Sequence, residues 1–337
     1  MKNPFFIEEC ISRFNLKNEE MNFIIDELLR TGMLSECENN YIDEKFSKTD
    51  FSFFDSQNIY KDNSICILGV PYDGGTTGVS GCKIAPNTLK KFTSNYSYLY
   101  NRIDKKFFIS YPNIDCYNNQ NIVDLGNILT IAGESSYDLH NRLEIAYKNH
   151  IKNKDNKIIV VGGDHSITYP ILNSFEEDII FLKFDAHYDD NLILNNIVNH
   201  SNFIRKIENI KNIKEIYHIG IREPRKPGLN INGKAITSDD IRNNNAELIF
   251  EEYLLNNANF YISIDVDVFD PLIVPATGYT LPYGINLGQI CNLIDYFNRI
   301  GNIIGVDIVE YNPLLDKNDI TMYTVMDLLK YLINILT

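Results

Sequence analysis

Two strings in this sequence, DAHYD at 185–189 and SIDVD at 263–267, place carboxylates and an imidazole at alternate positions after an apolar run. In an extended strand residues i and i+2 point to the same face, so each string aims its ligand-type side chains at one place. These candidates are Asp185, His187, Asp189, Asp265 and Asp267. Carboxylates and imidazoles are common ligands of divalent cations.

A third string, KIIVVGGDHS at 157–166, contains His165 near its end and supplies one more imidazole. Four carboxylates and two imidazoles form an oxygen-rich set that suits Mn²⁺ better than a thiolate site would, and they are enough for two ions. Two ions about 3.5–4 Å apart can hold a hydroxide between them as a nucleophile. Any one of these acids could instead cap a helix or face water, but aspartates this close together would repel one another without cations.

Short Val- and Ile-rich runs recur from Ser64 onward, with helical stretches between them. They cover residues 64–70, 121–126, 157–163, 178–187, 215–222, 260–269 and 302–310. Continuous apolar strands that alternate with helices predict an α/β fold, a three-layer, doubly wound parallel sheet, over residues 61–337. In such sheets ligands bind beyond the carboxyl ends of the strands, which is where the candidate ligands fall.

The first 60 residues have a different pattern. Two amphipathic segments, Pro4–Phe14 and Lys17–Met33, precede a polar stretch, Ser35–Asp62, that includes a possible short strand at Tyr41-Ile42. This pattern predicts a small, mainly helical module over residues 1–60, possibly of winged-helix type. The alternative is that these helices pack on the main domain or mediate oligomer contacts.

Composition and charge limit the classes of function. The chain has 337 residues, 44% of them hydrophobic, which predicts a compact enzyme-sized protein. A formal charge of −14 makes nucleic-acid binding improbable and mildly favours a cationic substrate. The six cysteines form no C-x-x-C pair, the N-terminus has no basic, apolar leader, and no apolar run reaches the roughly 20 residues that span a bilayer. We therefore expect reduced thiols in a cytoplasmic protein with no membrane role.

Taken together in their order, the motifs resemble those of the ureohydrolases, the arginase and agmatinase superfamily of binuclear manganese enzymes. The resemblance runs from about Ile65 to Leu336. It rests on GVPYDGGTT at 69–77, GCKIAP at 81–86, GGDHS at 162–166, DAHYD at 185–189, SIDVDVFDP at 263–271 and DIVEYNP at 307–313.

The resemblance implies two Mn²⁺ ions with shared ligands. One ion would be bound by His165, Asp185, Asp189 and Asp265, and the other by Asp185, His187, Asp265 and Asp267. A bridging hydroxide, oriented by Asp189, would attack the trigonal carbon of a guanidinium group and release urea and an amine.

The same resemblance implies three residues that contact the substrate. Glu310 would hold the guanidinium, whose fork of N–H donors is best met by a carboxylate. His200 would pass a proton to the leaving amine, a task that suits a group titrating near neutrality, although Ser201 follows it where the family usually has glycine. Thr277 would shape the pocket wall near Glu310. Alternatively, Glu310 could cap a helix, and Thr277-Gly278 could be a bend that ends a strand.

The substrate is less well defined by the sequence. Arginases hold the α-amino group of free arginine through an aspartate, and Arg225 stands where we align that aspartate, so free arginine in the usual pose is disfavoured. Arg225 and Lys226 could instead attract a carboxylate, or form a solvated loop. The N-terminal addition could grip a larger substrate, because some members of the superfamily convert arginine to ornithine within a ribosomal peptide.

Three hypotheses remain from the sequence. The leading one is a manganese amidinohydrolase that acts on a small guanidino compound or on arginine within a peptide. The second is a formimidoylglutamate-type hydrolase, which Arg225 favours and which His200 and Glu310 disfavour. The third is a non-catalytic, partner-binding homologue. A homo-oligomer is possible, because the family often forms trimers and hexamers.

Overall fold

The computed structural model describes residues 46–47, 49–56, 63–95, 100–101, 106–107, 122–150, 156–195, 197–224, 232–250 and 257–336. The chain divides into two units, Met1–Lys48 and Thr49–Thr337. Of the first unit only β1 (Phe46–Ser47) is described. The segments Pro4–Phe14 and Lys17–Met33 and the possible strand at Tyr41-Ile42 lie outside the described residues, so the N-terminal module stays a prediction.

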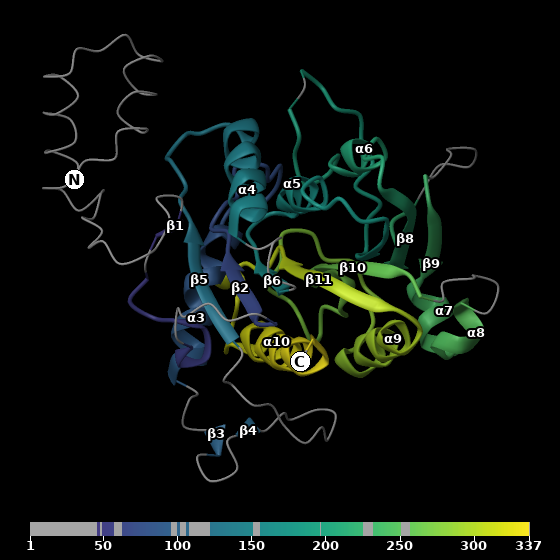
Figure 1. Cartoon of the computed structure of the whole chain (residues 1–337). Coiled ribbons are helices and arrows are strands. Elements are labelled where there is room, and N and C mark those ends of the chain that lie inside the picture. Colours follow the sequence, from purple (N-terminus) through teal and green to yellow (C-terminus); the bar gives the residue numbers. More distant parts are fainter. Residues whose placement is uncertain are drawn as a thin grey trace, which may run out of the picture. The chain divides into compact units, whose positions relative to one another are not determined.

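The second unit contains a parallel sheet. Eight of its strands lie side by side in the order β5-β2-β6-β11-β10-β7-β8-β9 (Figure 1). Every pairing between these neighbours is parallel. Their bounds are β2 Ile65–Gly69, β5 Ile122–Ile128, β6 Lys157–Val161, β7 Ile179–Phe184, β8 Ile213–Ile221, β9 Lys234–Thr237, β10 Asn259–Asp265 and β11 Asn302–Val309. A separate antiparallel pair joins β3 (Tyr100–Asn101) to β4 (Lys106–Phe107).

Helices cover both faces of the sheet, which gives the three layers expected of a doubly wound fold (Figure 1). One face carries α4 (Ser136–His150), α5 (Thr168–Leu172) and α6 (Ile204–Ile207), which contact one another in sequence. The other face carries α3 (Ala85–Asn95), α7 (Ser238–Asn243), α8 (Ala246–Phe250), α9 (Leu287–Ile300) and α10 (Ile320–Leu336). The α/β fold predicted from the alternating apolar runs is confirmed. Among the described helices, none is long and apolar enough to cross a membrane.

The predicted runs match seven of the strands, and six of them extend too far at their carboxyl ends, whereas the run 121–126 stops short of the end of β5 at Ile128. The run 178–187 becomes a strand that ends at Phe184, and the run 260–269 becomes one that ends at Asp265. At both places the chain leaves the sheet because the next residues carry the candidate ligands. Strand β9 was not predicted, because four residues with a lysine and a threonine at their ends give too short an apolar pattern.

Helix α9 shows how the sequence directs one of the covering helices. The Asn286 side chain caps it by accepting the backbone N–H of Gln289, and the Gln289 side chain accepts the backbone N–H of Asn286. The side chains that it buries recur at helical spacing, namely Ile290, Leu293, Ile294 and Phe297. The backbone then leaves the helix at Gly301.

A buried ion pair helps to hold Phe53 in place within the second unit. Lys90 Nζ lies 2.9 Å from Asp124 Oδ1, and both side chains are buried. Asp124 Oδ2 accepts the backbone N–H of Phe53 at 3.0 Å. Phe53 and Phe54 are themselves buried, so this end of the polar stretch packs on the rest of the second unit.

The described cysteines, Cys66, Cys82 and Cys291, are buried and form no disulfide. Each lies within or beside an element of the second unit, where it packs as a small apolar side chain. This agrees with the expectation of reduced thiols for these three positions.

His140 makes the stability of the fold depend on pH. Burial lowers the pKa of His140 to about 4, and its Nε2 lies 3.3 Å from Ser166 Oγ. Between the unfolded pKa, roughly 6.5, and about 4, the unfolded chain takes up a proton that the folded chain refuses, so the free energy of unfolding falls as the pH falls. We expect His140→Gln to reduce that fall, between pH 7 and pH 4.5, by an amount on the order of 2 kcal/mol. Urea unfolding at both pH values measures it.

The second buried histidine provides a check on this prediction. Burial also lowers the pKa of His218 to about 4, so His218→Gln should change the pH dependence in the same direction. If the free energy of unfolding of both variants depends on pH as that of the parent protein does, burial does not keep either histidine neutral in the folded protein.

Candidate metal centre and active site

The candidate ligands lie where four neighbouring strands end. Strands β6, β11, β10 and β7 are adjacent in the sheet, and each leads directly into one part of the site. Their contributions are His165 in the short helix η5 (His165–Ile167) after β6, Glu310 after β11, Asp265 at the end of β10 with Asp267 in η6 (Val266–Val268), and Asp185, His187 and Asp189 after β7. Parallel register places these ends at one edge of the sheet.

The first group of ligand atoms surrounds His165. Its Nδ1 lies 3.1 Å from Asp185 Oδ2, 3.3 Å from Asp265 Oδ2 and 3.4 Å from Asp189 Oδ2. His165 Nδ1 and Asp185 Oδ2 are buried, and neither makes a hydrogen bond of acceptable geometry. Ligand atoms roughly 3 Å apart are expected for neighbours on a coordination sphere with bonds of about 2 Å. The buried His165 Nδ1, which lacks a hydrogen bond and faces three carboxylate oxygens, therefore fits a metal ion.

The second group of ligand atoms shares Asp185 with the first. His187 Nδ1 lies 2.8 Å from Asp267 Oδ2 and 3.6 Å from Asp185 Oδ1. Asp185, His187 and Asp267 each offer one ligand atom, and the three atoms lie close enough together to hold an ion. The same is true of His165, Asp185 and Asp265. The structure thus brings all six predicted ligands together, with Asp185 between the two groups. Asp265 joins the first group only, and its Oδ1 accepts the N–H of Asp267 at 2.8 Å.

A chain of buried hydrogen bonds orients the His165 ring. His165 Nε2 lies 2.8 Å from Ser263 Oγ, and Ser263 Oγ donates to Asp307 Oδ1 at 2.5 Å. Because the serine proton goes to the carboxylate, Ser263 Oγ accepts from Nε2–H, and Nδ1 is left to face the aspartates. Tyr261 and Thr168 hold the other oxygen of Asp307 at 2.9 Å each. Partners of this kind fix the orientation of a metal-binding histidine.

Crowding of carboxylates changes their affinity for protons. Burial, together with the neighbouring Asp267 and Asp185, raises the pKa of Asp265 well above its usual range. Burial and Asp185 also raise the pKa of Asp267 to about 6. Burial opposes ionisation of Asp185 as well, but Lys183 and the two histidines hold the pKa of that carboxyl well below its usual range. The centre therefore needs positive charge to keep all its carboxylates ionised.

Lys183 supplies one such charge. It lies on β7, and its Nζ is 2.5 Å from Asp185 Oδ2 and 3.0 Å from Asp189 Oδ2. Burial alone would lower the pKa of this ammonium group, but the two carboxylates raise it above its usual range. Lys183 was not among the predicted site residues. The sequence feature that could have indicated it is a lysine within an apolar strand. Lys183 lies two positions before Asp185 and therefore on the same face.

The pair formed by His200 and Glu310 lies beside the first group. His200 Nδ1 is 3.1 Å from Glu310 Oε1, which also accepts the backbone N–H of His165 at 2.9 Å. On its other side, His200 Nε2 faces the N–H and the hydroxyl of Thr77 at 3.0 and 2.8 Å. Burial opposes protonation of His200, but its bond to Glu310 raises the pKa of the ring above its usual value. The ring can therefore hold a proton at Nδ1 next to the carboxylate.

Two site residues have a left-handed backbone. Asp189 has φ 54° and Glu310 has φ 65°, a region that side chains other than glycine rarely occupy. The Glu310 N–H donates to Gly163 O at 2.8 Å, which holds this conformation at the end of β11. Such strain is concentrated at functional sites, where the surroundings impose it.

Thr277 and Tyr279 lie next to this pair. Thr277 is buried, and the carbonyl of its neighbour Ala276 accepts the N–H of Asn312, two residues after Glu310. The half-exposed ring of Tyr279 lies 5.9 Å from that of His200 and 6.3 Å from that of His187, measured between centroids. Tyr279 was not predicted as a site residue. The other predicted residue, Arg225, lies outside the described residues.

Arg222 secures the loop that carries Asp267. Its guanidinium donates to the carbonyls of Asp267 at 2.6 Å, Val268 at 3.0 Å and Leu281 at 3.1 Å. A side chain with five N–H donors can bind several carbonyls at once. The position of Asp267 therefore depends on a residue that directly follows β8.

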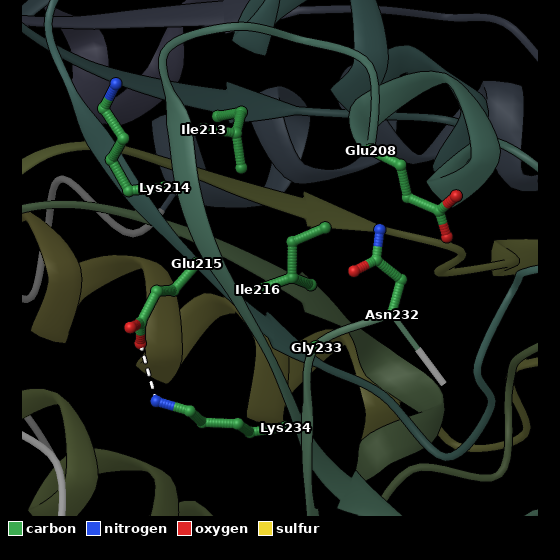
Figure 2. A pocket seen from close by; sticks show the side chains of 8 residues that line it. All are labelled: Glu208, Ile213, Lys214, Glu215, Ile216, Asn232, Gly233 and Lys234. Atoms are coloured by element: carbon green, nitrogen blue, oxygen red, sulfur yellow. Dashed lines mark hydrogen bonds and ion pairs between the residues drawn. The ribbon is translucent and has the colours of Figure 1, made fainter. Parts of the chain in front are cut away.

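A separate pocket lies at the other end of the sheet. Its volume is about 440 Å³, and Figure 2 shows that its walls come from the amino-terminal parts of β8 and β9, with Glu215 and Lys234 paired across it at 2.8 Å. The lining residues are Glu208, Ile213, Lys214, Glu215, Ile216, Asn232, Gly233 and Lys234. None of the candidate ligands lines it, so this pocket is not the candidate active site.

With this geometry in view, comparison with known proteins identifies the class. The profile of the Arginase family matches residues 63–334, and the chain belongs to that family. It is a hydrolase of the arginase and agmatinase type, as the sequence motifs indicated.

Individual relatives agree with this assignment. An uncharacterised 32.2 kDa protein of Methanothermus fervidus is 31% identical over 250 residues, which cover 72% of this chain and 82% of that protein. The agmatinase of Blochmanniella floridana is 29% identical over 269 residues, 77% of this chain and 84% of the relative. The crystal structure of the agmatine ureohydrolase of Thermoplasma volcanium is 26% identical, has a TM-score of 0.71, and covers 86% of this chain and 94% of that one.

The hydrogen-bond chain behind His165 generates a prediction about metal binding. Ser263→Ala removes the acceptor that fixes the ring, so we expect the affinity for Mn²⁺ to fall by roughly 10- to 100-fold. Isothermal titration calorimetry with Mn²⁺ measures the change. The matched control is Ser174→Ala, because Ser174 is also buried and donates to Pro170 O, outside the site. Equal Mn²⁺ affinities in both variants and the parent protein would show that Ser263 does not support metal binding.

Proposed function

We propose that this protein is a binuclear manganese amidinohydrolase that cleaves a guanidino group to urea and an amine. The observation that carries the proposal is the His200–Glu310 pair, which lies beside two groups of ligand atoms joined by Asp185. A carboxylate for the guanidinium, a histidine for the leaving amine and a place for two cations are the parts that this reaction needs.

The proposed ion ligands are the six residues whose atoms converge. Following the resemblance, we assign His165, Asp185, Asp189 and Asp265 to one ion and Asp185, His187, Asp265 and Asp267 to the other. Asp265 lies in the first group only, so its part in binding the second ion rests on the resemblance. Their nitrogen and carboxylate atoms suit Mn²⁺. When bound, two such ions supply a nucleophile derived from water at neutral pH and withdraw electrons from the bond that breaks.

The remaining steps belong to side chains of this chain. Both hydrogen bonds that the described residues make to Glu310 go to Oε1, which leaves Oε2 for the guanidinium. His200 holds a proton at Nδ1 within 3.1 Å of that carboxylate, and it delivers a proton to the amine as the C–N bond breaks. Thr277 and Tyr279 form the wall that faces the rest of the substrate. Asp189 orients the nucleophile.

We propose a substrate other than free arginine. Arg225 stands where the resemblance places an aspartate for the α-ammonium group of free arginine, and an arginine cannot accept a bond from an ammonium. Agmatine keeps that amine but lacks the α-carboxylate, so it need not bind in the pose of free arginine. An arginine within a peptide has an amide in place of the ammonium group. The names of the Blochmanniella and Thermoplasma relatives support the first, and the predicted module over residues 1–60 supports the second.

The other two hypotheses have less support. Formimidoylglutamate carries two carboxylates, one of them next to its formimidoyl group, and the Glu310 carboxylate beside the ligand groups would repel that neighbouring carboxylate. No contact of Arg225 supports this hypothesis, since that residue lies outside the described part of the chain. A non-catalytic homologue would have no reason to keep six ligand-type side chains converged around two buried atoms that lack hydrogen bonds.

Urea release from three compounds tests the substrate proposal. Full-length protein loaded with Mn²⁺ is incubated with agmatine, with free arginine and with an arginine peptide blocked at both ends. We expect turnover of agmatine or of the blocked peptide to exceed that of free arginine. Preference for free arginine would contradict the proposed substrate, and release of formamide from formimidoylglutamate without urea from any of the three would contradict the proposed function.

Two variants separate metal binding from substrate binding. Asp265→Asn removes a ligand of the buried centre and should abolish both Mn²⁺ retention and turnover. Glu310→Gln should keep the ions but lose a charge-assisted bond, which corresponds to a fall in kcat/KM of roughly 10- to 100-fold. Metal analysis and steady-state kinetics measure both. Full activity of Asp265→Asn would show that the ligand assignment is wrong.

The proposed module generates a separate prediction. If residues 1–60 hold a peptide substrate, deleting residues 1–45, which spares the buried Phe53 and Phe54, should raise KM for the blocked peptide and leave turnover of agmatine unchanged. Equal losses for both substrates would mean that this segment serves stability or assembly instead.

A further inference from the structure

The hydroxyl of Thr77 lies beside His200, and the proposed mechanism does not use it. Thr77 belongs to the loop that follows β2, and the residue is exposed. Its backbone N–H and its hydroxyl oxygen lie 3.0 and 2.8 Å from His200 Nε2. The buried ring of His200 therefore meets this loop at Nε2, while its Nδ1 meets Glu310.

The loop is fixed against His200 by bonds in both directions. The backbone N–H of His200 donates to Gly75 O at 3.1 Å, and the Thr77 N–H donates to the ring. Asp73 closes the loop, because its Oδ2 accepts the N–H of Gly81 at 2.8 Å. These bonds hold the Thr77 N–H towards Nε2.

The Thr77 N–H determines where the neutral His200 ring carries its proton. A backbone N–H donates and cannot accept, so the bond to Nε2 requires a lone pair there. The single proton of the neutral ring then lies at Nδ1, where Glu310 Oε1 accepts it at 3.1 Å. Release of that proton would turn the ring into an anion. His200 must therefore bind a second proton before it can give one to a leaving amine.

The second proton has to enter at Nε2, where it meets two groups of Thr77. The backbone N–H is a donor and would oppose it, whereas the hydroxyl oxygen can accept it. Because the residue is exposed, the hydroxyl can turn its own hydrogen towards water at the same time. The hydroxyl can thus serve both protonation states of the ring, and the N–H serves only the neutral one.

The charged groups around the ring do not replace this acceptor. Burial opposes protonation of His200, but Glu310, Asp189 and Asp164 favour it and raise its pKa above the usual value. The ring of Tyr279, from the loop after β10, lies 5.9 Å away between centroids and carries no charge. Within the described part of the chain, the hydrogen bonds of Nε2 go to the β2 loop alone.

We propose that the Thr77 hydroxyl accepts the proton at His200 Nε2 and thereby lets His200 act as the acid that protonates the leaving amine. The inference rests on the proposed function, because it takes His200 to be the proton donor. In each turnover the ring takes one proton from water, gives one to the amine nitrogen as the C–N bond breaks, and returns to its neutral form. Thr77 acts through His200 and is a positioning residue.

The pH dependence of urea release tests this. Full-length protein loaded with Mn²⁺ is assayed with agmatine and with the blocked arginine peptide, and the faster substrate is used for the profile. The kcat of the parent protein should fall at alkaline pH, where His200 loses its second proton. Thr77→Val keeps the shape and the backbone N–H but not the hydroxyl. In this variant the fall should begin about one pH unit lower, which corresponds to roughly a tenfold loss of kcat at alkaline pH.

A structural role of Thr77 would not give this pattern. At pH values below the fall, kcat of Thr77→Val should stay within roughly twofold of the parent value, and KM should change less than about threefold throughout, because ground-state binding is untouched. Thr77→Ser keeps the hydroxyl and should restore the parent profile. Thr77→Ala replaces Thr77→Val if the valine variant does not fold.

Two further variants complete the test. Thr324→Val is the matched control, since the Thr324 hydroxyl donates to Ile320 O in α10, and it should leave the profile unchanged. His200→Asn removes the proposed acid and should lower kcat. Adding Thr77→Val to His200→Asn should cause no further loss, because both residues serve the same step.

Each other outcome overturns the inference. A parent-like profile in Thr77→Val, an equal loss of kcat at every pH, or additive losses in the double variant would overturn it and leave the proposed function standing. The same holds if kcat of the parent protein does not fall at alkaline pH. Full activity of His200→Asn would overturn the proposed role of His200 and the inference together, as would the absence of urea release by the parent protein.

Discussion

Repulsion among buried carboxylates is the constraint on which the candidate centre depends. Asp185, Asp265 and Asp267 are almost completely buried within one small volume, where water cannot screen them. The protein partly meets this constraint with cations that it carries itself, and bound metal ions would supply the positive charge that is still lacking. His165, His187 and Lys183 all face these acids. The polar surroundings, including Ser263 with Asp307 and Arg222 with its carbonyls, fix where each group points.

The parallel sheet makes this concentration of charge possible. Neighbouring parallel strands end at the same edge, so residues from positions as distant as 165 and 310 come together without a long-range loop. The apolar parts of β6, β7, β10 and β11 are buried and supply the stability that the acids at their ends do not. The pocket at the amino ends of β8 and β9 lies at the opposite ends of the strands, and none of the candidate ligands lines it.

Much of the fold and of the site followed from sequence periodicity. Alternation in DAHYD and SIDVD placed ligand-type side chains on one face, and apolar runs predicted their strands, because both signals arise from local geometry. The spacing could not show contacts between distant segments. The bond from Thr77 to His200 joins residues 123 positions apart, and the reach of Arg222 to Asp267 and Leu281 joins different loops. Lys183 was missed for another reason: a lysine in an apolar run is usually read as a strand-edge residue, and only its neighbours reveal that it is buried.

The left-handed backbone of Asp189 and Glu310 has a consequence for how this protein can change by mutation. Glycine relieves the strain of a positive φ, whereas other side chains pay for it, so replacing either residue by glycine removes a carboxylate and relaxes the chain at the same position. Loss of function at these two places is therefore favoured, or only weakly opposed, by the stability of the fold. Under the roles proposed for Asp189 and Glu310, the main cost of such a replacement is the lost carboxylate, because the backbone itself gains from glycine.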